Sequence, residues 1–128
     1  MKVDEKDLVI LHHMLDAINS MILVFNNMTK YTMEFDNPSI KDALLMQIIQ
    51  IGELTKHLST EFKSVNKGVP WSKLLKTRNI GSHDYAAVDW DLIVNLINRE
   101  ISRLHGELLL ILDLHEKEPY KFNFQRKM

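Results

Sequence analysis

The segment PSIKDALLMQIIQIGELTKHL, residues 38–58, decides the fold because its mostly apolar stripe recurs every three or four residues. The positions of this stripe are Ile40, Leu44, Ile48, Ile51, Thr55 and Leu58. Side chains at this spacing lie on one face of an α-helix, so the segment predicts a helix with one face in a core. Asn37 and Pro38 are typical of a helix cap followed by a first-turn proline. Gly52 is a poor helix former and predicts that another backbone approaches closely there.

The segments on either side show the same spacing. A first helix is expected between Asp4 and Asp36, with a stripe of Leu8, Leu11, Leu15, Ile18, Ile22 and Phe25. A third, shorter helix is expected from Pro70, with Trp71, Leu74 and Leu75 on its apolar face. The methionines along the first two helices are interpreted as core residues. Only four glycines and three prolines interrupt the chain, which favours long helices.

The fourth helix is predicted to be the longest, with Asp89 as its cap and Pro119 at its end. Its core-facing stripe is Ile93, Ile97, Ile101, Leu104, Leu108 and Ile111, and a second side carries Leu92, Leu96, Arg99 and Arg103. Residues 108–112 are apolar all round, which predicts burial on more than one side. We therefore predict an all-α, up-down bundle of four to five helices in residues 1–116, followed by a C-terminal tail, 117–128.

Composition excludes several classes of protein. A length of 128 residues suits one domain, and a net charge of −1 means that any attraction for nucleic acid must come from a local patch. The absence of cysteine excludes disulfides, thiol catalysis and cysteine-bound zinc. No histidines stand at metal-binding helix spacing, so no metal is expected. The charged start lacks a signal-peptide pattern and no apolar run approaches membrane-spanning length, which predicts a cytoplasmic protein without membrane contact.

The stretch RNIGSHDY, residues 78–85, breaks the helical pattern. If the third helix continued, Arg78 would stand where its core face predicts a leucine, and Tyr85 would share that face two turns later. His83 would lie well round the helix unless Gly81 loosens it. Residues 62–83 contain no acid, while Lys63, Lys67, Lys73, Lys76 and Arg78 are present. This basic segment would attract a phosphate backbone, although lysines also simply solvate helices.

Histidine and arginine together suit RNA cleavage without a metal. Histidine transfers protons near neutral pH, arginine donates two hydrogen bonds to a phosphate, and the 2′-hydroxyl of RNA supplies the nucleophile. Each chain supplies one histidine of this motif, so a symmetric dimer would supply the second. Structural alternatives remain open: His83 as a helix cap, Arg78 paired with Glu53 or Asp84, and Tyr85 as a half-buried wedge.

Arg78-x4-His83-x-Tyr85 resembles the R-x4-6-H-x-Y signature of HEPN domains, in particular the HepT-like toxins. Further matches are Ile51-Gly52-Glu53 with the family's IGE motif, Pro70-Trp71, the Arg78-Asn79 pair and the acidic Asp89. The order of helices agrees, and the resemblance covers residues 5–115. The combined motifs are more specific than the R-x4-H-x-Y string alone.

The resemblance implies a homodimeric ribonuclease toxin whose antitoxin is an MntA-type nucleotidyltransferase. Arg78 and His83 would be the catalytic pair, and Tyr85 would accept AMP that the partner transfers from ATP. Asn79, Glu53 and Gly52 would support the site. Lys73 and Lys76 would contact RNA, and the chain itself would need no cofactor.

Two features depart from the family pattern. Asp84 follows the histidine, where an acid would raise the histidine pKa and weaken the positive field. The aromatic tail from Tyr120 has no counterpart, and stacking on bases, packing on a partner and disorder all remain open for it. The alternative function is a non-catalytic HEPN module that dimerises and binds a nucleotidyltransferase.

Overall fold

The computed structural model of the chain describes residues 3–30, 37–82 and 88–113, and all regular structure in these ranges is helical. The elements are α1 (Glu5–Lys30), α2 (Pro38–His57), α3 (Thr60–Val65), α4 (Trp71–Lys76), the 3₁₀-helix η1 (Thr77–Ser82), α5 (Trp90–Leu96), the π-helical turn η3 (Ile97–Ile101) and α6 (Ser102–Ile111). Because α5, η3 and α6 follow one another without a break, they form one long helix.

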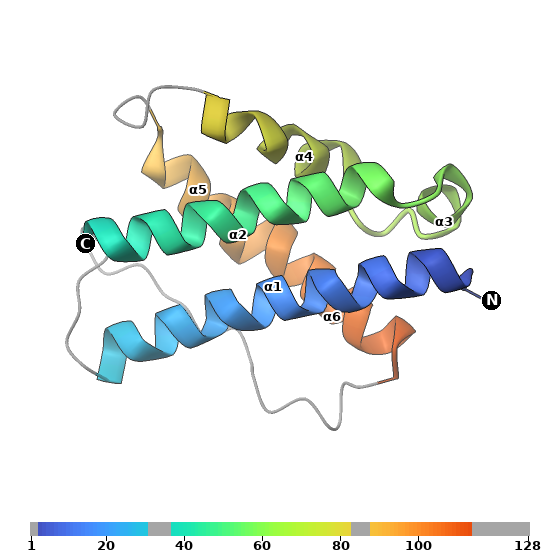
Figure 1. The fold of residues 1–128 in the computed structure, drawn as a ribbon, viewed down its shortest axis with the longest axis horizontal. Helices are drawn as coiled ribbons and strands as arrows, with labels where there is room; N and C mark the ends of the chain where they lie inside the picture. The colour runs from blue at the N-terminus through green and yellow to red at the C-terminus, as the bar shows by residue number, and fades with distance from the viewer. Residues whose placement is uncertain (1–2, 31–36, 83–87, 114–128) are drawn as a thin grey trace.

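Helices α1 and α2 pack side by side and run in opposite directions (Figure 1). The long α5–η3–α6 helix crosses behind this pair, and α4 with η1 lies along the other side of α2 (Figure 1). The predicted all-α, up-down bundle is therefore confirmed for the described residues. The division into a domain of residues 1–116 and a tail stays a prediction.

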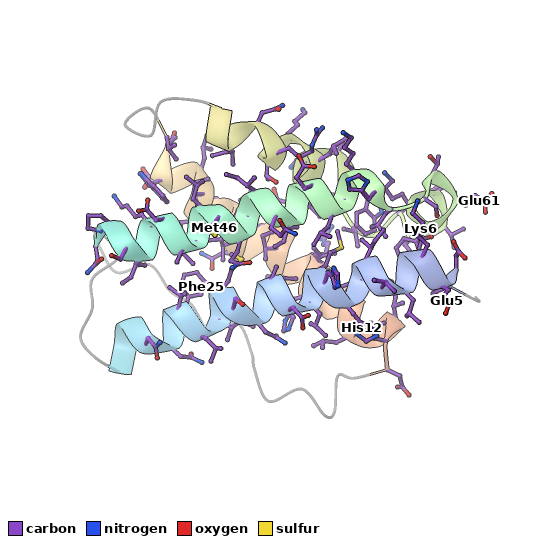
Figure 2. All side chains as sticks on the ribbon, in the orientation of Figure 1. Glu5, Lys6, His12, Phe25, Met46 and Glu61 are labelled. Atoms are coloured by element: carbon purple, nitrogen blue, oxygen red, sulfur yellow. The ribbon has the colours of Figure 1, made fainter. Side chains whose placement is uncertain are left out.

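The stripe that decided the fold is buried as expected. Every one of its positions in residues 40–58 is buried, and the core continues with Leu11, Ile18, Leu74, Ile97, Ile101, Leu104 and Leu108. Phe25 lies between α1 and α2, while Glu5 and Glu61 are exposed (Figure 2). The helical period of the sequence thus corresponds to one contiguous core.

The predicted helix caps are also observed. The backbone N–H of Ser39 donates to Oδ1 of Asn37 at 2.8 Å, which caps α2. The side chain of Asp89 accepts from the N–H groups of Asp91 and Leu92, which caps α5. Each cap satisfies backbone donors that have no partner inside their helix.

The structure settles two features around the third helix that the sequence had left open or had not shown. The α-helix ends at Lys76, and η1 follows it instead of a continued α-helix, so seven residues no longer correspond to two α-turns. The short helix α3 was also not predicted. It is capped by Ser59, whose N–H and hydroxyl donate to the buried carboxylate of Asp7 at 2.9 and 2.6 Å. This contact joins the start of α1 to the connection between α2 and α3.

The end of the fourth helix also differs from the prediction. In the described residues α6 ends at Ile111, well before Pro119, and Leu110 is 61% exposed. Leu108 is fully buried, and Leu109, Ile111 and Leu112 are partly buried against the core. The apolar composition of residues 108–112 therefore corresponds to partial burial that leaves Leu110 exposed.

The π-helical turn in the fourth helix was not predicted. The buried residues Ile93 in α5 and Ile97 and Ile101 in the π-turn stand four apart. In a regular α-helix, residues at this spacing move gradually around the helix axis. A π-turn contains more residues than an α-turn, so this spacing stays on one face. We attribute the π-turn to the need to keep all three isoleucines in the core.

Helix α1 is more apolar than the composition suggested. Its segment Glu5–Asn27 has the length and mean hydropathy, 1.7, of a membrane-spanning helix, so the expectation that no run approaches this length is wrong. Half of this segment is buried inside the bundle, as in the core helix of a globular domain. The cytoplasmic location stays a prediction.

Candidate active site at the α2–η1 joint

Gly52 lies where α2 and η1 approach most closely. A Cβ atom at this position would collide with Oγ1 of Thr77 and would lie 2.8 Å from the backbone nitrogen of Arg78. Real Cβ atoms essentially never show such contacts with backbone, so only glycine permits this approach. The prediction that another backbone packs against Gly52 is therefore confirmed, and the backbone concerned is the one that carries Arg78.

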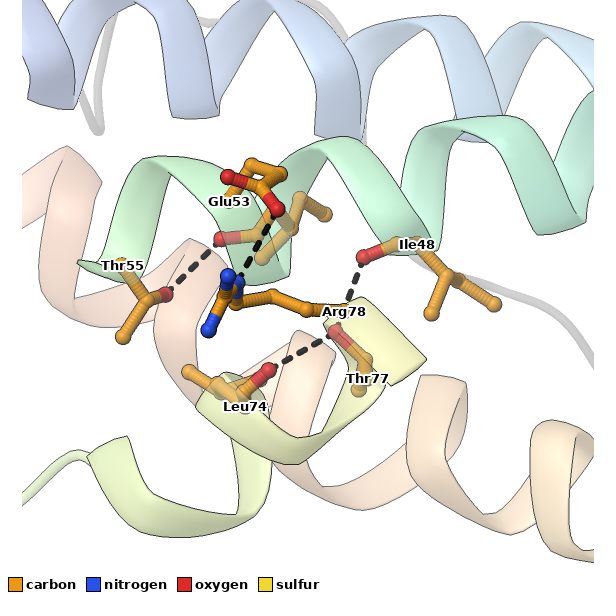
Figure 3. Close-up of polar contacts among 7 residues, drawn as sticks. Ile48, Glu53, Thr55, Leu74, Thr77 and Arg78 are labelled. Atoms are coloured by element: carbon orange, nitrogen blue, oxygen red, sulfur yellow. Dashed lines mark hydrogen bonds and ion pairs between the residues drawn. The ribbon is translucent and has the colours of Figure 1, made fainter. Parts of the chain in front are cut away.

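The buried side chain of Thr77 joins the two elements. Its hydroxyl oxygen lies 3.0 Å from the carbonyl oxygen of Ile48 in α2 and 2.7 Å from that of Leu74 in α4 (Figure 3). The hydroxyl can donate its proton to either carbonyl. It thereby holds the end of α4 against α2, one residue before Arg78.

Arg78 extends from η1 to α2 and contacts Glu53. Its Nε–H donates to Oε1 of Glu53 at 2.9 Å (Figure 3). The side chains are 30% and 43% exposed, so the pair lies at the surface and in contact with solvent. Of the pairings left open by the sequence, the one with Glu53 is therefore observed.

The electrostatics of the pair favour a fixed carboxylate. The hydrogen bond from Arg78 holds the pKa of Glu53 below its ordinary value, and the positive charges of Arg78, Lys56 and His57 lower it further. Glu53 therefore stays ionised at neutral pH. Glu53 accepts a hydrogen bond from Nε of Arg78 only. The two terminal amino groups of the guanidinium can therefore still donate paired hydrogen bonds to a phosphate.

The remaining predicted site residues in the described part of the chain lie on η1 and α4. Asn79 is exposed on η1, next to Arg78. Lys76 is exposed at the end of α4, and Lys73 points toward the π-turn, where its Nζ lies 3.6 Å from Oε1 of Glu100. His83 and Tyr85 lie outside the described residues. The structure thus brings together Gly52, Glu53 and Arg78, and their relation to the histidine and tyrosine stays a prediction.

Trp71, the second residue of the Pro-Trp motif, anchors the start of α4. Its Nε1–H donates to the carbonyl oxygen of Asn66 at 2.9 Å, and its ring meets that of Phe62 edge-on, with 6.0 Å between the centroids. This fixes α4 at its beginning, as Thr77 fixes it at its end. Arg78 therefore follows a short helix that is held at both ends.

Sequence reasoning missed Thr77. Its residue type is common in loops and gives no signal by itself, but its position next to Arg78 and opposite a helical glycine could have indicated a packed joint. Arg99 and Arg103 were placed on one helix side without a role. In the described residues, no group of three or more His, Asp or Glu side chains is placed to hold a metal.

The chain matches one protein family. The family model described as "Ribonuclease HepT-like" matches residues 14–111, which include the α2–η1 joint and the motif that follows it. No solved structure matches the chain.

Three curated proteins are similar to this chain. A Methanocaldococcus jannaschii protein named "Gamma-glutamylcyclotransferase and putative RNase" is 29% identical over 119 residues, 90% of this chain and 52% of that protein. A second protein of that organism, named "Putative RNase", is 24% identical over 79% of this chain and 92% of its own length. A "Putative RNase" of Caldanaerobacter subterraneus subsp. tengcongensis is 30% identical over 59% of this chain and 68% of its own length. The chain thus spans about half of the first relative and most of the other two.

Proposed function

Because the chain belongs to the HepT-like ribonuclease family, we propose that it is the endoribonuclease toxin of a HepT/MntA toxin–antitoxin system. The observation that carries this proposal is the Glu53–Arg78 pair, which holds a guanidinium at the surface five residues before His83. The relatives named as RNases support the same class of reaction. Arg78 and His83 are the catalytic residues that we propose.

The proposed reaction needs no metal. The 2′-hydroxyl oxygen of RNA attacks the adjacent phosphorus, a 2′-O–P bond forms, and the P–O5′ bond breaks. One His83 imidazole takes the proton of the 2′-hydroxyl, and a second, protonated imidazole gives a proton to the leaving O5′. Arg78 stabilises the negative charge that develops on the non-bridging phosphate oxygens. The products are a 2′,3′-cyclic phosphate and a 5′-hydroxyl.

A homodimer would supply the two imidazoles, and the exposed face of α2 supports this assembly. Met46, the one methionine of α2, is 68% exposed, so the interpretation of the methionines along the first two helices as core residues is wrong for this one. It stands seven residues before Glu53, so both lie on the same side of α2. A large apolar side chain exposed on the side of α2 that carries Glu53 suits a contact with a second copy, in which the two sites face each other.

The activity is tested with the purified chain and a single-stranded RNA in the presence of EDTA. We expect cleavage that leaves cyclic phosphate ends, and we expect His83→Ala to abolish it without changing the helical circular dichroism spectrum. The matched control is His12→Ala, which removes an exposed imidazole from α1, away from the α2–η1 joint. If the wild-type chain is as inert as His83→Ala, the alternative function as a non-catalytic binding module replaces the ribonuclease.

The dimer is tested by placing a charge on the proposed contact. We expect Met46→Glu to shift the mass measured by light scattering from two chains to one and to lower the cleavage rate. Val65→Glu, which alters an exposed apolar residue on α3, is the control and should leave the mass unchanged. A wild-type chain that is monomeric under these conditions contradicts the dimer.

We further propose that the toxin is silenced by AMP on Tyr85. A nucleotidyltransferase of the MntA type would transfer AMP from ATP to the tyrosine hydroxyl and release pyrophosphate. The added phosphate would occupy the place of the RNA phosphate near Arg78 and would repel a second one. Incubation with such an enzyme and ATP should add the mass of AMP to wild type but not to Tyr85→Phe, and cleavage should fall in parallel.

A further inference from the structure

A second cationic site lies where α4 faces the π-turn. A hollow of about 260 Å³ is lined by Pro70 and Lys73 on one side and by Arg99, Glu100 and Arg103 on the other. This hollow is distinct from the α2–η1 joint, because Lys73 contacts the π-turn whereas Arg78 contacts α2. It is slightly smaller than the usual site for a drug-sized molecule, so it suits a small polar group.

The charges around the hollow are unbalanced. Three lining side chains are cationic and one is acidic, in a chain whose net charge is −1. Glu100 is only 14% exposed and lies 3.6 Å from Lys73, which is 60% exposed. In the described part of the chain no acidic side chain pairs with Arg99 or Arg103, and both are exposed. The two guanidinium groups therefore remain available to an external anion.

Both arginines border the same hollow because they stand four residues apart. Arg99 belongs to the π-turn, and Arg103 follows it in α6. In a regular α-helix residues four apart already lie on the same face, and the wider π-turn reduces the remaining offset between them. The two arginines thus lie on the exposed side of the helix, while Ile97 and Ile101 are buried in the core. Single π-turns are frequent at functional sites.

We propose that Lys73, Arg99 and Arg103 form a subsite for a backbone phosphate of the RNA strand, outside the bond that is cleaved. Arginine grips phosphate through two N–H groups, and lysine adds a point charge. Because the three cations are exposed and contact phosphate only, the subsite adds affinity without selecting a sequence. This inference rests on the proposed ribonuclease function, since that function supplies the RNA strand.

Binding of a labelled single-stranded RNA, measured on the His83→Ala chain at several salt concentrations, tests the subsite. We expect Arg99→Gln/Arg103→Gln to weaken binding about 10- to 100-fold, the effect of losing charge-assisted contacts. The slope of log affinity against log salt should become shallower by about 0.7 for one lost phosphate contact. Lys6→Ala, which removes an exposed cation from α1, is the control. Two RNAs of unrelated sequence should respond equally.

The outcomes separate this subsite from the ribonuclease proposal. With His83 intact, Arg99→Gln/Arg103→Gln should raise KM and leave kcat unchanged. If the chain cleaves RNA and the double variant binds and cleaves like wild type, the subsite is wrong and the ribonuclease stands. If neither the wild-type chain nor any variant cleaves RNA, but the double variant binds RNA more weakly and with a shallower salt dependence, the subsite is supported and the ribonuclease proposal is not. If inorganic phosphate binds and the double variant loses only that binding, the hollow takes a free anion and the proposal is overturned.

Discussion

Arginines on two sides of the same short helix are held in different ways. Arg78, which follows α4, lies against α2 and is fixed by a hydrogen bond to Glu53. Arg99 in the π-turn and Arg103 in α6 line the hollow next to α4 and stay exposed. A guanidinium that is held by a carboxylate is prepared to meet charge at one defined place, whereas exposed guanidinium groups attract a flexible polyanion. If our proposals hold, the arginine that positions the reacting phosphate and those that attract the RNA strand lie on two different sides of α4.

The largest effect that we expect from this division is on Arg78. Arg78→Ala should lower kcat/KM for RNA by about 10²–10³, the usual loss when one preorganised donor is removed. Arg78→Lys should fall between wild type and alanine, because lysine keeps the charge but lacks Nε and the planar fork. Cleavage kinetics measure both. If Arg78→Ala changes only KM, then Arg78 contributes to RNA binding alone, as we propose for Arg99 and Arg103. That result would contradict the difference between the two sets of arginines.

The close approach at Gly52 should give the next largest effect. Gly52→Ala places a Cβ atom against backbone of η1, so the joint must open, and we expect a loss of about 1–3 kcal/mol in the free energy of unfolding. Gly106→Ala is the matched control, since a Cβ there meets nothing within 4 Å. It should stabilise α6 by roughly 0.5–1 kcal/mol. Urea unfolding of both variants measures the difference, and equal values would contradict the tight joint.

Two buried threonines sharpen the analysis of the same joint. Thr77→Val removes a hydroxyl that lies between carbonyl groups of α2 and α4 and should cost about 1 kcal/mol of stability. Thr55→Val removes a hydroxyl that donates only to Ile51 in its own helix, at 2.8 Å. Such a bond adds little to a helix, so this variant should cost less. Thermal unfolding that ranks the two in the reverse order would argue against Thr77 as the connection.

The smallest effect that we expect is a dependence of the Glu53–Arg78 pair on pH. Because the pKa of Glu53 is lower in the folded chain than its ordinary value of 4.5, the pair stabilises the fold above that pH. The contribution is lost as pH falls below 4.5 and Glu53 becomes protonated. The stability difference between wild type and Glu53→Gln should therefore be small at pH 7 and vanish in acid. Urea unfolding at both pH values measures this stability difference. A difference that grows in acid would contradict the lowered pKa of Glu53.

The family resemblance found in the sequence is confirmed by the comparisons, and so is the helical fold. Of the candidate site, the contact of Glu53 with Arg78 was one of two pairings left open. The partners stand 25 residues apart on different helices, so no local pattern could choose between Glu53 and Asp84. Whether the third helix continues could not be read from the sequence for the same reason: the contact of Thr77 with α2 is a tertiary contact, and it lies where the helix changes to η1.

Periodicity and capping residues by themselves determined the main helices of this protein, because both act over a few neighbouring residues. They determined the stripe of residues 40–58, the caps at Asn37 and Asp89, and the apolar face of α1 from Leu11 to Phe25, although the predicted Leu8 is exposed. Only the tertiary structure decided the joint at Gly52, the end of α4 and the π-turn between α5 and α6. These features depend on which helices meet and how closely, and that is set by packing between segments far apart in the chain.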